Sequence, residues 1–466
     1  MALFNKVVVA NRGAVAARVL RTLNAMGLHS VAVYSDADRT APYLEHASET
    51  AHIGGAPARE SYLNQDRLLE VARTHHADAL HPGYGFLSEN AGFAERVEQG
   101  GVRFIGPSPK WIDAMGHKTR ARELATRHGW PIGRGSGVLT GDAHDVLKTA
   151  DEIGYPILVK PAAGGGGIGM LPARCATELL EVVERAASMA ERGFASREVY
   201  LERLVERPRH VEVQVVGDRH GHVAHVFERD CSVQRRHQKI IEEARAPGLA
   251  EGQLAPLLAR ITSTLSALGY DSLGTVEMLL APDGEFRFLE MNTRLQVEHG
   301  VTEEITGIDL VRAQVRSAAG ERLGDILPAA VEAAGHAVQA RVYAEDPKRF
   351  LPSPGTLAVF APPSDRDVRV ETGYRKGMVV TPHYDPLLAK VIAKGATRTQ
   401  AIDRLCDALA AFAIEGLRHN IPALQAILRS DEFMAGEVHT GLAMQVVGRE
   451  GASEDEAKGQ AWRQRN

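Results

Sequence analysis

The sequence predicts a multi-domain protein of mixed α/β and α+β architecture, and three observations support this prediction. The chain has 466 residues with 44% hydrophobic and 24% charged composition, which is normal globular content and too long for one ordinary hydrophobic core. Its first segment reads as strand, turn, helix and strand. Its later segments are dominated by strands in which apolar and polar residues alternate. We therefore expect an α/β domain first and β-richer domains after it.

The first domain is predicted from an apolar strand at 6–10, a turn at 11–13, a helix at 14–26 and a second strand at 30–34. This is a βαβ unit. The stretch 11–18 holds one glycine where a dinucleotide-binding fingerprint needs three, so a dehydrogenase is disfavoured.

Further boundaries follow from changes of pattern along the chain. A strand at 157–160, a glycine-rich loop, a helix at 177–191 and a strand at 198–204 indicate a small inserted α+β domain. A hairpin is predicted at 275–292. The expected units are an N-terminal α/β domain at 1–115, a linker and lid domain at 116–204, a strand-rich core at 205–330, a β-rich C-terminal domain with two helices at 331–446, and a disordered polar tail at 447–466.

Charge and composition argue against several classes of function. The net charge of -5 comes from interspersed acids and bases, so neither nucleic acid nor a lipid surface is an expected partner. We find no signal peptide at the N-terminus and no apolar run of membrane-spanning length. The three cysteines are far apart, which suits reduced thiols and a cytoplasmic protein.

The glycine-rich loop at 163–170 directly follows the strand that ends at Lys160. Consecutive glycines let backbone N–H groups approach phosphate oxygens, and a lysine at the strand end adds a positive charge. We interpret the loop as a mobile phosphate lid, against the alternative of a flexible surface loop. The spacing is not that of the Walker motif, so a P-loop kinase is disfavoured.

A second site is predicted from the hairpin at 275–292. A four-residue turn that pairs Ala281 with Phe286 places Glu277 opposite Glu290. Facing carboxylates repel unless a cation lies between them, and Asn292 adds a neutral oxygen on the same face. These oxygens suit magnesium. A one-residue slip in the turn would instead leave a solvated acidic face.

Polar residues continue to alternate from 290 to 298. If this stretch is extended, it lines one face of a cleft beside the metal, where Arg294 can bind a small anion and Glu298 can deprotonate it. An exposed amphipathic edge strand is the alternative. The cationic cluster at 234–239 would, on its own, be read as a solvated basic turn.

Several motifs together closely resemble the biotin carboxylases of the ATP-grasp superfamily, from about Lys6 to Gly441. They are Ala10-Asn11-Arg12-Gly13, His81-Pro82-Gly83-Tyr84-Gly85-Phe86-Leu87-Ser88-Glu89-Asn90, Glu228-Arg229-Asp230-Cys231-Ser232, Asn292-Thr293-Arg294-Leu295-Gln296-Val297-Glu298-His299 and Ala344-Glu345-Asp346-Pro347. The resemblance implies a Rossmann-like N-terminal domain, an ATP-grasp centre with a glycine-rich lid and a β-rich C-terminal domain.

The resemblance also implies roles for individual residues. Those for ATP are Lys118, Lys160, Gly165, Gly166, Gly167, Glu202, Arg203, Val205, His210, Gln234 and His237. Those for Mg2+ or Mn2+ are Glu277, Glu290 and Asn292, and those for bicarbonate are Lys239, Arg294, Gln296 and Val297. Glu298 would be the base, and Tyr84 and Arg341 would bind biotin, with Arg341 stabilising its enolate.

The implied reaction carboxylates biotin that is carried by another protein, with ATP and bicarbonate as the other substrates. The chain holds no Met-Lys-Met biotinylation motif and no length for a carboxyltransferase, so we expect a separate carrier and a separate carboxyltransferase. We also expect a homodimer. Ile168, Arg245 and Gly300 depart from the acetyl-CoA type. The stretches around Ile168 and Gly300, together with 53–58, are more similar to the urea and guanidine carboxylase branch, which leaves the final acceptor open. Another ATP-grasp ligase and a catalytically silent regulatory paralogue are the alternatives.

Overall fold

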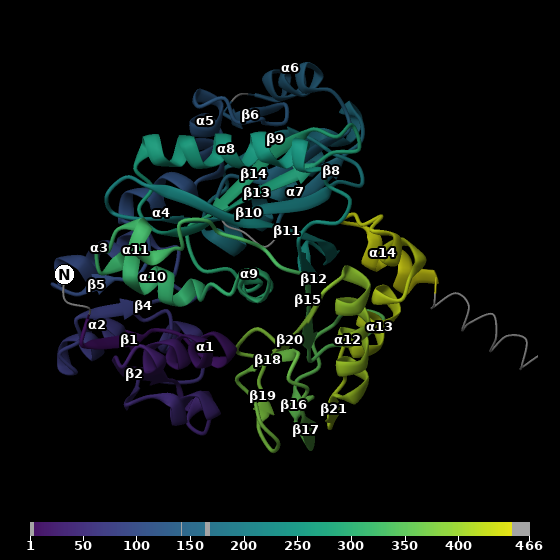
Figure 1. The fold of residues 1–466 in the computed structure, drawn as a ribbon. Helices are drawn as coiled ribbons and strands as arrows, with labels where there is room; N and C mark the ends of the chain where they lie inside the picture. Colours follow the sequence, from purple (N-terminus) through teal and green to yellow (C-terminus); the bar gives the residue numbers. More distant parts are fainter. Residues whose placement is uncertain (1–3, 141, 164–167, 450–466) are drawn as a thin grey trace, which may run out of the picture.

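The N-terminal part forms a parallel sheet with helices on both sides. In this computed structural model, which describes residues 4–140, 142–163 and 168–449 (Figure 1), the strand order is β3-β2-β1-β4-β5. The strands are β1 (Lys6–Val9), β2 (His29–Tyr34), β3 (Glu49–His52), β4 (Ala79–His81) and β5 (Arg103–Phe104). The associated helices are α1 (Gly13–Ala25), η1 (Asp36–Asp38), η2 (Pro42–His46), η3 (Ala58–Glu60), α2 (Gln65–Thr74) and α3 (Ala91–Gln99). The predicted βαβ unit is confirmed within a residue at each boundary.

The inserted lid is a separate small sheet with two helices packed on it, at the top of Figure 1. Its strands lie in the order β6-β9-β7-β8. Connecting helices α4 (Pro109–Gly116) and α5 (Lys118–Arg127) lead to β6 (Gly135–Val138), α6 (Ala143–Ile153), β7 (Ile157–Pro161), β8 (Leu171–Ala173), α7 (Ala176–Phe194) and β9 (Val199–Arg203). The apolar faces of α6 and α7 bury Val146, Leu179 and Val182 against the sheet, as amphipathic helices do.

One large sheet of eight strands runs through the rest of the molecule, in the order β14-β13-β10-β11-β12-β15-β20-β18. Its strands are β10 (Arg209–Gly217), β11 (Val223–Arg235), β12 (Gln238–Ala244), β13 (Leu273–Leu280), β14 (Phe286–Asn292), β15 (His336–Tyr343), β18 (Val368–Thr372) and β20 (Leu387–Gly395). Helix α8 (Glu251–Leu268) covers one end of this sheet, and α9 (His299–Thr306), α10 (Leu310–Ala318) and α11 (Leu323–Ile326) lie between it and the N-terminal domain. The sheet crosses the predicted boundary at residue 330, and the domain boundaries remain a prediction.

The C-terminal region packs helices against β15 and β20. These helices are α12 (Arg398–Ala411), α13 (Ile421–Leu428) and α14 (Asp431–Ala435), and the short strands are β16 (Gly355–Thr356), β17 (Val359–Ala361), β19 (Val379–Val380) and β21 (Ala413–Glu415). The described part of this region therefore holds α12, α13, α14 and a further helical stretch at 442–449, where the sequence predicted two helices. Residues 447–449 of the predicted disordered tail belong to this helical stretch, and the rest of the tail, 450–466, lies outside the described residues. In the described ranges, no helix is both long and apolar enough to cross a membrane.

Candidate active site

A cavity of about 370 Å³ lies between the lid sheet and the eight-stranded sheet. Of the site residues predicted from the sequence, it is lined by Lys118, Lys160, Glu202, Arg203, Val205, His210, Gln234, His237, Lys239, Glu277, Glu290, Asn292, Arg294, Gln296, Val297, Glu298 and Arg341. Gly165, Gly166 and Gly167 lie outside the described residues. Tyr84 is partly buried and does not line this cavity, but Arg341 is close enough to act electrostatically on its hydroxyl.

Two lysines approach the lid end of the cavity. The Lys160 Nζ lies 3.0 Å from an oxygen of Glu202, and Arg122 binds the other oxygen at 2.9 Å. Burial lowers the pKa of Lys160 although Glu202 opposes the shift. The Lys118 Nζ lies 3.9 Å from Glu290, so both ammonium groups can meet an anionic ligand from one end.

The hairpin places Glu277 opposite Glu290 as predicted, but it does so by a different route. The turn has one more residue than expected, because Leu280 and not Ala281 pairs with Phe286. A β-bulge at Leu289 then restores the expected register. Without the bulge, Glu277 would face Leu289 and Glu290 would point to the opposite side of the sheet.

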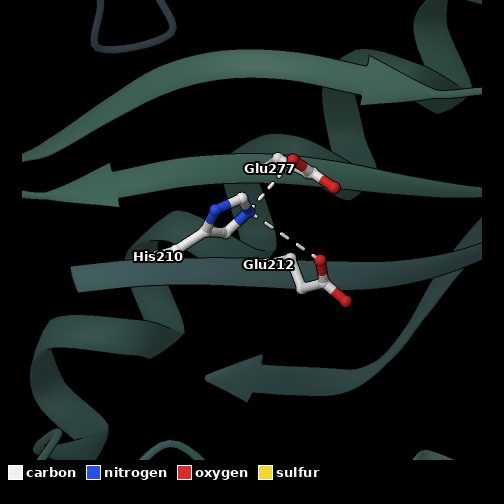
Figure 2. Close-up of side chains that lie close together, drawn as sticks. All are labelled: His210, Glu212 and Glu277. Carbon is white, nitrogen blue, oxygen red and sulfur yellow. Dashed lines mark ion pairs between the residues drawn. The ribbon is translucent and has the colours of Figure 1, made fainter. Parts of the chain in front are cut away.

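Glu277 is held by cations and amides around it. Its Oε2 lies 3.0 Å from the His210 Nε2, which also lies 3.9 Å from Glu212 (Figure 2). Asn292 and Gln296 each donate to its Oε1, at 2.9 and 3.0 Å. Burial acts to raise the pKa of Glu277, but Lys239 and His210 outweigh it and hold this pKa well below its usual value.

Lys239 is the central cation of the site. Its Nζ lies 2.6 Å from Glu212, 2.8 Å from Glu277 and 2.7 Å from Glu298. Burial alone would lower the pKa of this lysine, and the three carboxylates raise it well above its usual value. Of its basic neighbours, Arg236 and His237 are exposed, whereas Arg235 is buried and pairs with Glu345 at 2.6 Å. The interpretation of 234–239 as a solvated turn is therefore wrong for Lys239 and Arg235.

Glu298 is fully buried and bound on both oxygens. Its Oε1 accepts from Lys239, and its Oε2 accepts from the Arg341 Nη2 at 3.0 Å. Burial acts to raise the pKa of Glu298, but Lys239, Arg341 and Arg229 lower it below the usual value. Glu298 is therefore ionised, and it becomes a stronger base when these cations move to another anion.

The segment after Asn292 is not the extended strand that the alternation suggested. Strand β14 ends at Asn292, and Glu298 is the N-cap residue of α9. Arg294 bends back to donate to Asn292 Oδ1 and Gln296 Oε1, at 2.8 and 2.9 Å. Its Nε donates to Glu89 at 2.8 Å. The predicted polar side chains therefore meet through an irregular loop, and the strand assignment for 293–298 is wrong.

Comparisons with known proteins agree with this arrangement. Family models match for the biotin carboxylase N-terminal domain (residues 3–112), the carbamoyl-phosphate synthase L chain ATP-binding domain (117–326) and the biotin carboxylase C-terminal domain (339–445). Biotin carboxylase 2 of Bacillus subtilis is 46% identical over 443 residues, which cover 95% of this chain and 100% of the relative. The Haemophilus influenzae biotin carboxylase is 45% identical and covers 93% and 97%. The chain belongs to the biotin carboxylase family.

Solved structures give the same result. The biotin carboxylase domain dimer of the Hydrogenobacter thermophilus 2-oxoglutarate carboxylase, in complex with MgADP, ADP and bicarbonate, superposes with a TM-score of 0.92 at 40% identity, covering 96% of this chain and 98% of that one. The Campylobacter jejuni biotin carboxylase in its β-γ-ATP complex also gives 0.92, at 39% identity and 95% and 99% coverage. This member of the biotin carboxylase family is accordingly an ATP-dependent ligase.

The donor set at the hairpin fits a divalent metal. Glu277 and Glu290 face each other and line the cavity, and Asn292 adds an amide beside them. Hard carboxylate and amide oxygens are the ligands that Mg2+ prefers. The Glu290 carboxylate is 28% exposed, and its nearest cation is Lys118 at 3.9 Å, so its oxygens remain open to an ion from the cavity.

Sequence reasoning missed several residues of the biotin carboxylase site. Glu212 joins His210 and Lys239, Glu89 binds Arg294, and Glu242 binds Arg341. Glu212 had a usable signal, because it follows His210 by two residues and therefore lies on the same face of its strand. Glu89 and Glu242 had none, since their partners lie about a hundred residues or more away in sequence.

The three departures lie in different surroundings. Ile168 is 51% exposed, and the Arg245 guanidinium stacks over Phe227 at 5.5 Å. Gly300 is fully enclosed, and a Cβ there would lie 2.4 Å from the Ile392 Cδ1. A proline at position 300 would therefore require Ile392 to move.

Proposed function

We propose that this biotin carboxylase binds ATP and bicarbonate in the cavity and uses them to carboxylate biotin through carboxyphosphate. The observation that carries the proposal is the buried Glu298 between Lys239 and Arg341, next to Arg294. This is an ionised carboxylate in an enclosed site whose cations can each be shared with a small anion.

The positions of the side chains support separate roles along the cavity. Lys118 and Lys160 at the lid end would neutralise the ATP phosphates, His237 would line the nucleotide site beside them, and Glu202 to Val205 at the end of β9 would bind the adenine. Mg2+ held by Glu277, Glu290 and Asn292 would neutralise charge on the transferring phosphoryl group. The solved structure with MgADP and bicarbonate supports this choice of ligands.

Lys239, Arg294, Gln296 and the backbone of Val297 would bind bicarbonate. As this anion enters, Lys239 and Arg341 divide their charge between it and Glu298, which raises the pKa of Glu298 towards the range of a working base. Glu298 then removes the bicarbonate proton, and the resulting oxyanion attacks the γ-phosphate to give carboxyphosphate and ADP.

Carboxyphosphate then breaks its C–O bond to give CO2 and phosphate. The phosphate takes the proton from the biotin ureido nitrogen, and that nitrogen attacks the CO2. Arg341 would stabilise the biotin enolate by charge, with Tyr84 beside it. Positioning and charge neutralisation therefore supply most of the catalysis.

The biotin would be attached to a separate carrier protein, and a separate carboxyltransferase would use the carboxybiotin. A homodimer is supported by the dimeric Hydrogenobacter domain. The final acceptor would be an acyl-CoA such as acetyl-CoA or a urea- or guanidine-type amide.

The test measures ADP release by the purified protein with Mg2+ and bicarbonate, with and without free biotin at high concentration. Biotin-stimulated, bicarbonate-dependent release supports the proposal. ADP release without any response to biotin or to an authentic carrier would instead favour another ATP-grasp ligase. ATP binding without turnover under all these conditions would identify a silent paralogue.

A further inference from the structure

A buried lysine lies directly behind the wall of the proposed bicarbonate site. Lys390 is on β20, with 0% exposure, and it pairs across the sheet with Arg341 on β15 and with Glu371 on β18. Cross-strand partners point to the same face of a sheet. Lys390 therefore stands beside the catalytic arginine but does not line the cavity.

Lys390 contacts the backbone of the loop at 293–298, which we call the catalytic loop because it ends at Glu298. Its Nζ donates to the carbonyl oxygen of Val297 at 2.8 Å. One residue earlier, the carbonyl oxygen of Gln296 lies 2.6 Å from the Nδ1 of His299, which is fully buried. A carbonyl can accept only, so Nδ1 carries the proton. The two carbonyls that precede Glu298 are thus both held from the buried side.

These bonds fix the direction of two N–H groups. In a trans peptide the N–H points opposite to the carbonyl of the same unit, so the N–H of Glu298 points away from Lys390 and the N–H of Val297 points away from the His299 ring. Among the residues that the structure describes, no protein acceptor takes either N–H. Adjacent backbone N–H groups without a protein acceptor form an anion-binding concavity.

We propose that Lys390 and His299 are positioning residues for bicarbonate, which orient the Val297 and Glu298 peptides so that their N–H groups and the Glu298 carboxylate face the same anion. This inference rests on the proposed function, because it assigns bicarbonate to this part of the cavity.

The alternative is that Lys390 only neutralises Glu371. Glu371 already has Arg21 at 3.1 Å and Arg18 at 3.5 Å, and it also pairs with Arg369. These three guanidinium groups all approach the Glu371 Oε1, and the Lys390 Nζ lies 2.5 Å from its Oε2, so Lys390 also pairs with Glu371. None of these arginines contacts Val297, whereas Lys390 does. The structure therefore favours a role for Lys390 in positioning the catalytic loop.

The experiment compares Lys390→Met with Lys394→Met. Both lysines lie on β20, and the Lys394 side chain has no polar partner among the described residues. Steady-state ADP release is measured against bicarbonate and, separately, against ATP. A charged hydrogen bond is worth about 1.5–3 kcal/mol, so we expect the KM for bicarbonate of Lys390→Met to rise about tenfold or more. The KM for ATP should change less than about twofold, and Lys394→Met should match the wild type.

A second pair of variants keeps the test independent of folding of the lysine variant. His299→Asn can place an amide N–H where Nδ1 lies, whereas His299→Leu cannot. We expect His299→Leu to raise the KM for bicarbonate and His299→Asn to restore most of it. Equal effects of Lys390→Met on the two KM values, or a rise in His299→Asn as large as that in His299→Leu, would overturn the inference. Failure of the wild type itself to use bicarbonate would instead overturn the proposed function.

Discussion

Two clusters of charge lie next to each other in this protein, and they differ in what surrounds them. The cavity cluster consists of Glu212, Lys239, Glu277, Glu298 and Arg341, and all but Glu212 line the cavity. The enclosed cluster consists of Arg18, Glu303, Asp309, Arg369, Glu371 and Lys390, and none of these lines it. Both clusters pair every carboxylate with a cation, as buried charges require.

The difference lies in whether the pairing can change. In the cavity cluster a bound anion can take over part of the charge of Lys239 and Arg341, which changes the basicity of Glu298. In the enclosed cluster Arg18 joins α1 to Glu303 on α9 at 2.8 Å, and Arg369 joins β18 to the same glutamate at 2.7 Å. Neither pair lines the cavity. The same chemistry therefore serves reactivity in one cluster and the docking of elements in the other.

The largest expected effect is on activity, at the centre of the cavity cluster. Glu298→Gln keeps the shape of the side chain but removes the base, so we expect bicarbonate-dependent ADP release to fall about 10²–10⁴-fold. The binding of MgADP, measured by calorimetry, should stay near the wild-type value because the phosphate site is unchanged. Normal turnover in this variant would show that another group is the base.

A comparable loss in free energy is expected for folding, at the centre of the enclosed cluster. Burial acts to raise the pKa of Glu371, but Lys390 and Arg369 hold this pKa well below its usual value. Glu371→Gln removes the carboxylate that pairs with both cations and leaves Lys390 without an ion-pair partner among the described residues, which should lower the free energy of unfolding by about 3–5 kcal/mol. Urea denaturation followed by circular dichroism measures it.

Glu45→Gln is the matched control for this substitution. Glu45 pairs with Arg375 at the surface, where the two side chains are 64% and 50% exposed. Such pairs contribute little because water and salt screen them. Equal urea midpoints for Glu371→Gln and Glu45→Gln would contradict the distinction between enclosed and exposed pairs.

The sequence allowed the cavity cluster to be predicted far better than the enclosed one. Glu277 and Glu290 could be placed together by counting along a hairpin, because strand geometry is regular and local. That count was right only because the longer turn and the bulge at Leu289 shift the register in opposite directions. Neither the bulge nor the loop from 293 to 298 has a signal in the residue pattern.

The roles of Lys239 and Lys390 could not be inferred from their neighbours in sequence. Lys239 looked like part of a solvated basic turn, and its three carboxylates come from strands and a loop up to about sixty residues away. Lys390 stands in an apolar strand, where a lysine signals burial but not a partner. The pairing of buried charges depends on tertiary contacts, and resemblance to a family supplied in one case what local physics could not.

The smallest expected effect concerns pH and the edge of the enclosed cluster. Burial, with a smaller contribution from Arg18, lowers the pKa of His81 to about 3. Below about pH 6.5 His81 binds a proton in the unfolded chain but not in the folded protein. The free energy of unfolding therefore falls as pH falls from about 6.5 towards about 3. The limiting slope for one group is about 1.4 kcal/mol per pH unit. His81→Gln should reduce the measured slope of the unfolding free energy between pH 6 and 5, whereas His46→Gln, at an exposed position, should leave it as in the wild type. An unchanged slope in His81→Gln would mean that protonation of other groups causes the loss of stability at low pH. The carboxylates of the cavity cluster would then be the next groups to substitute.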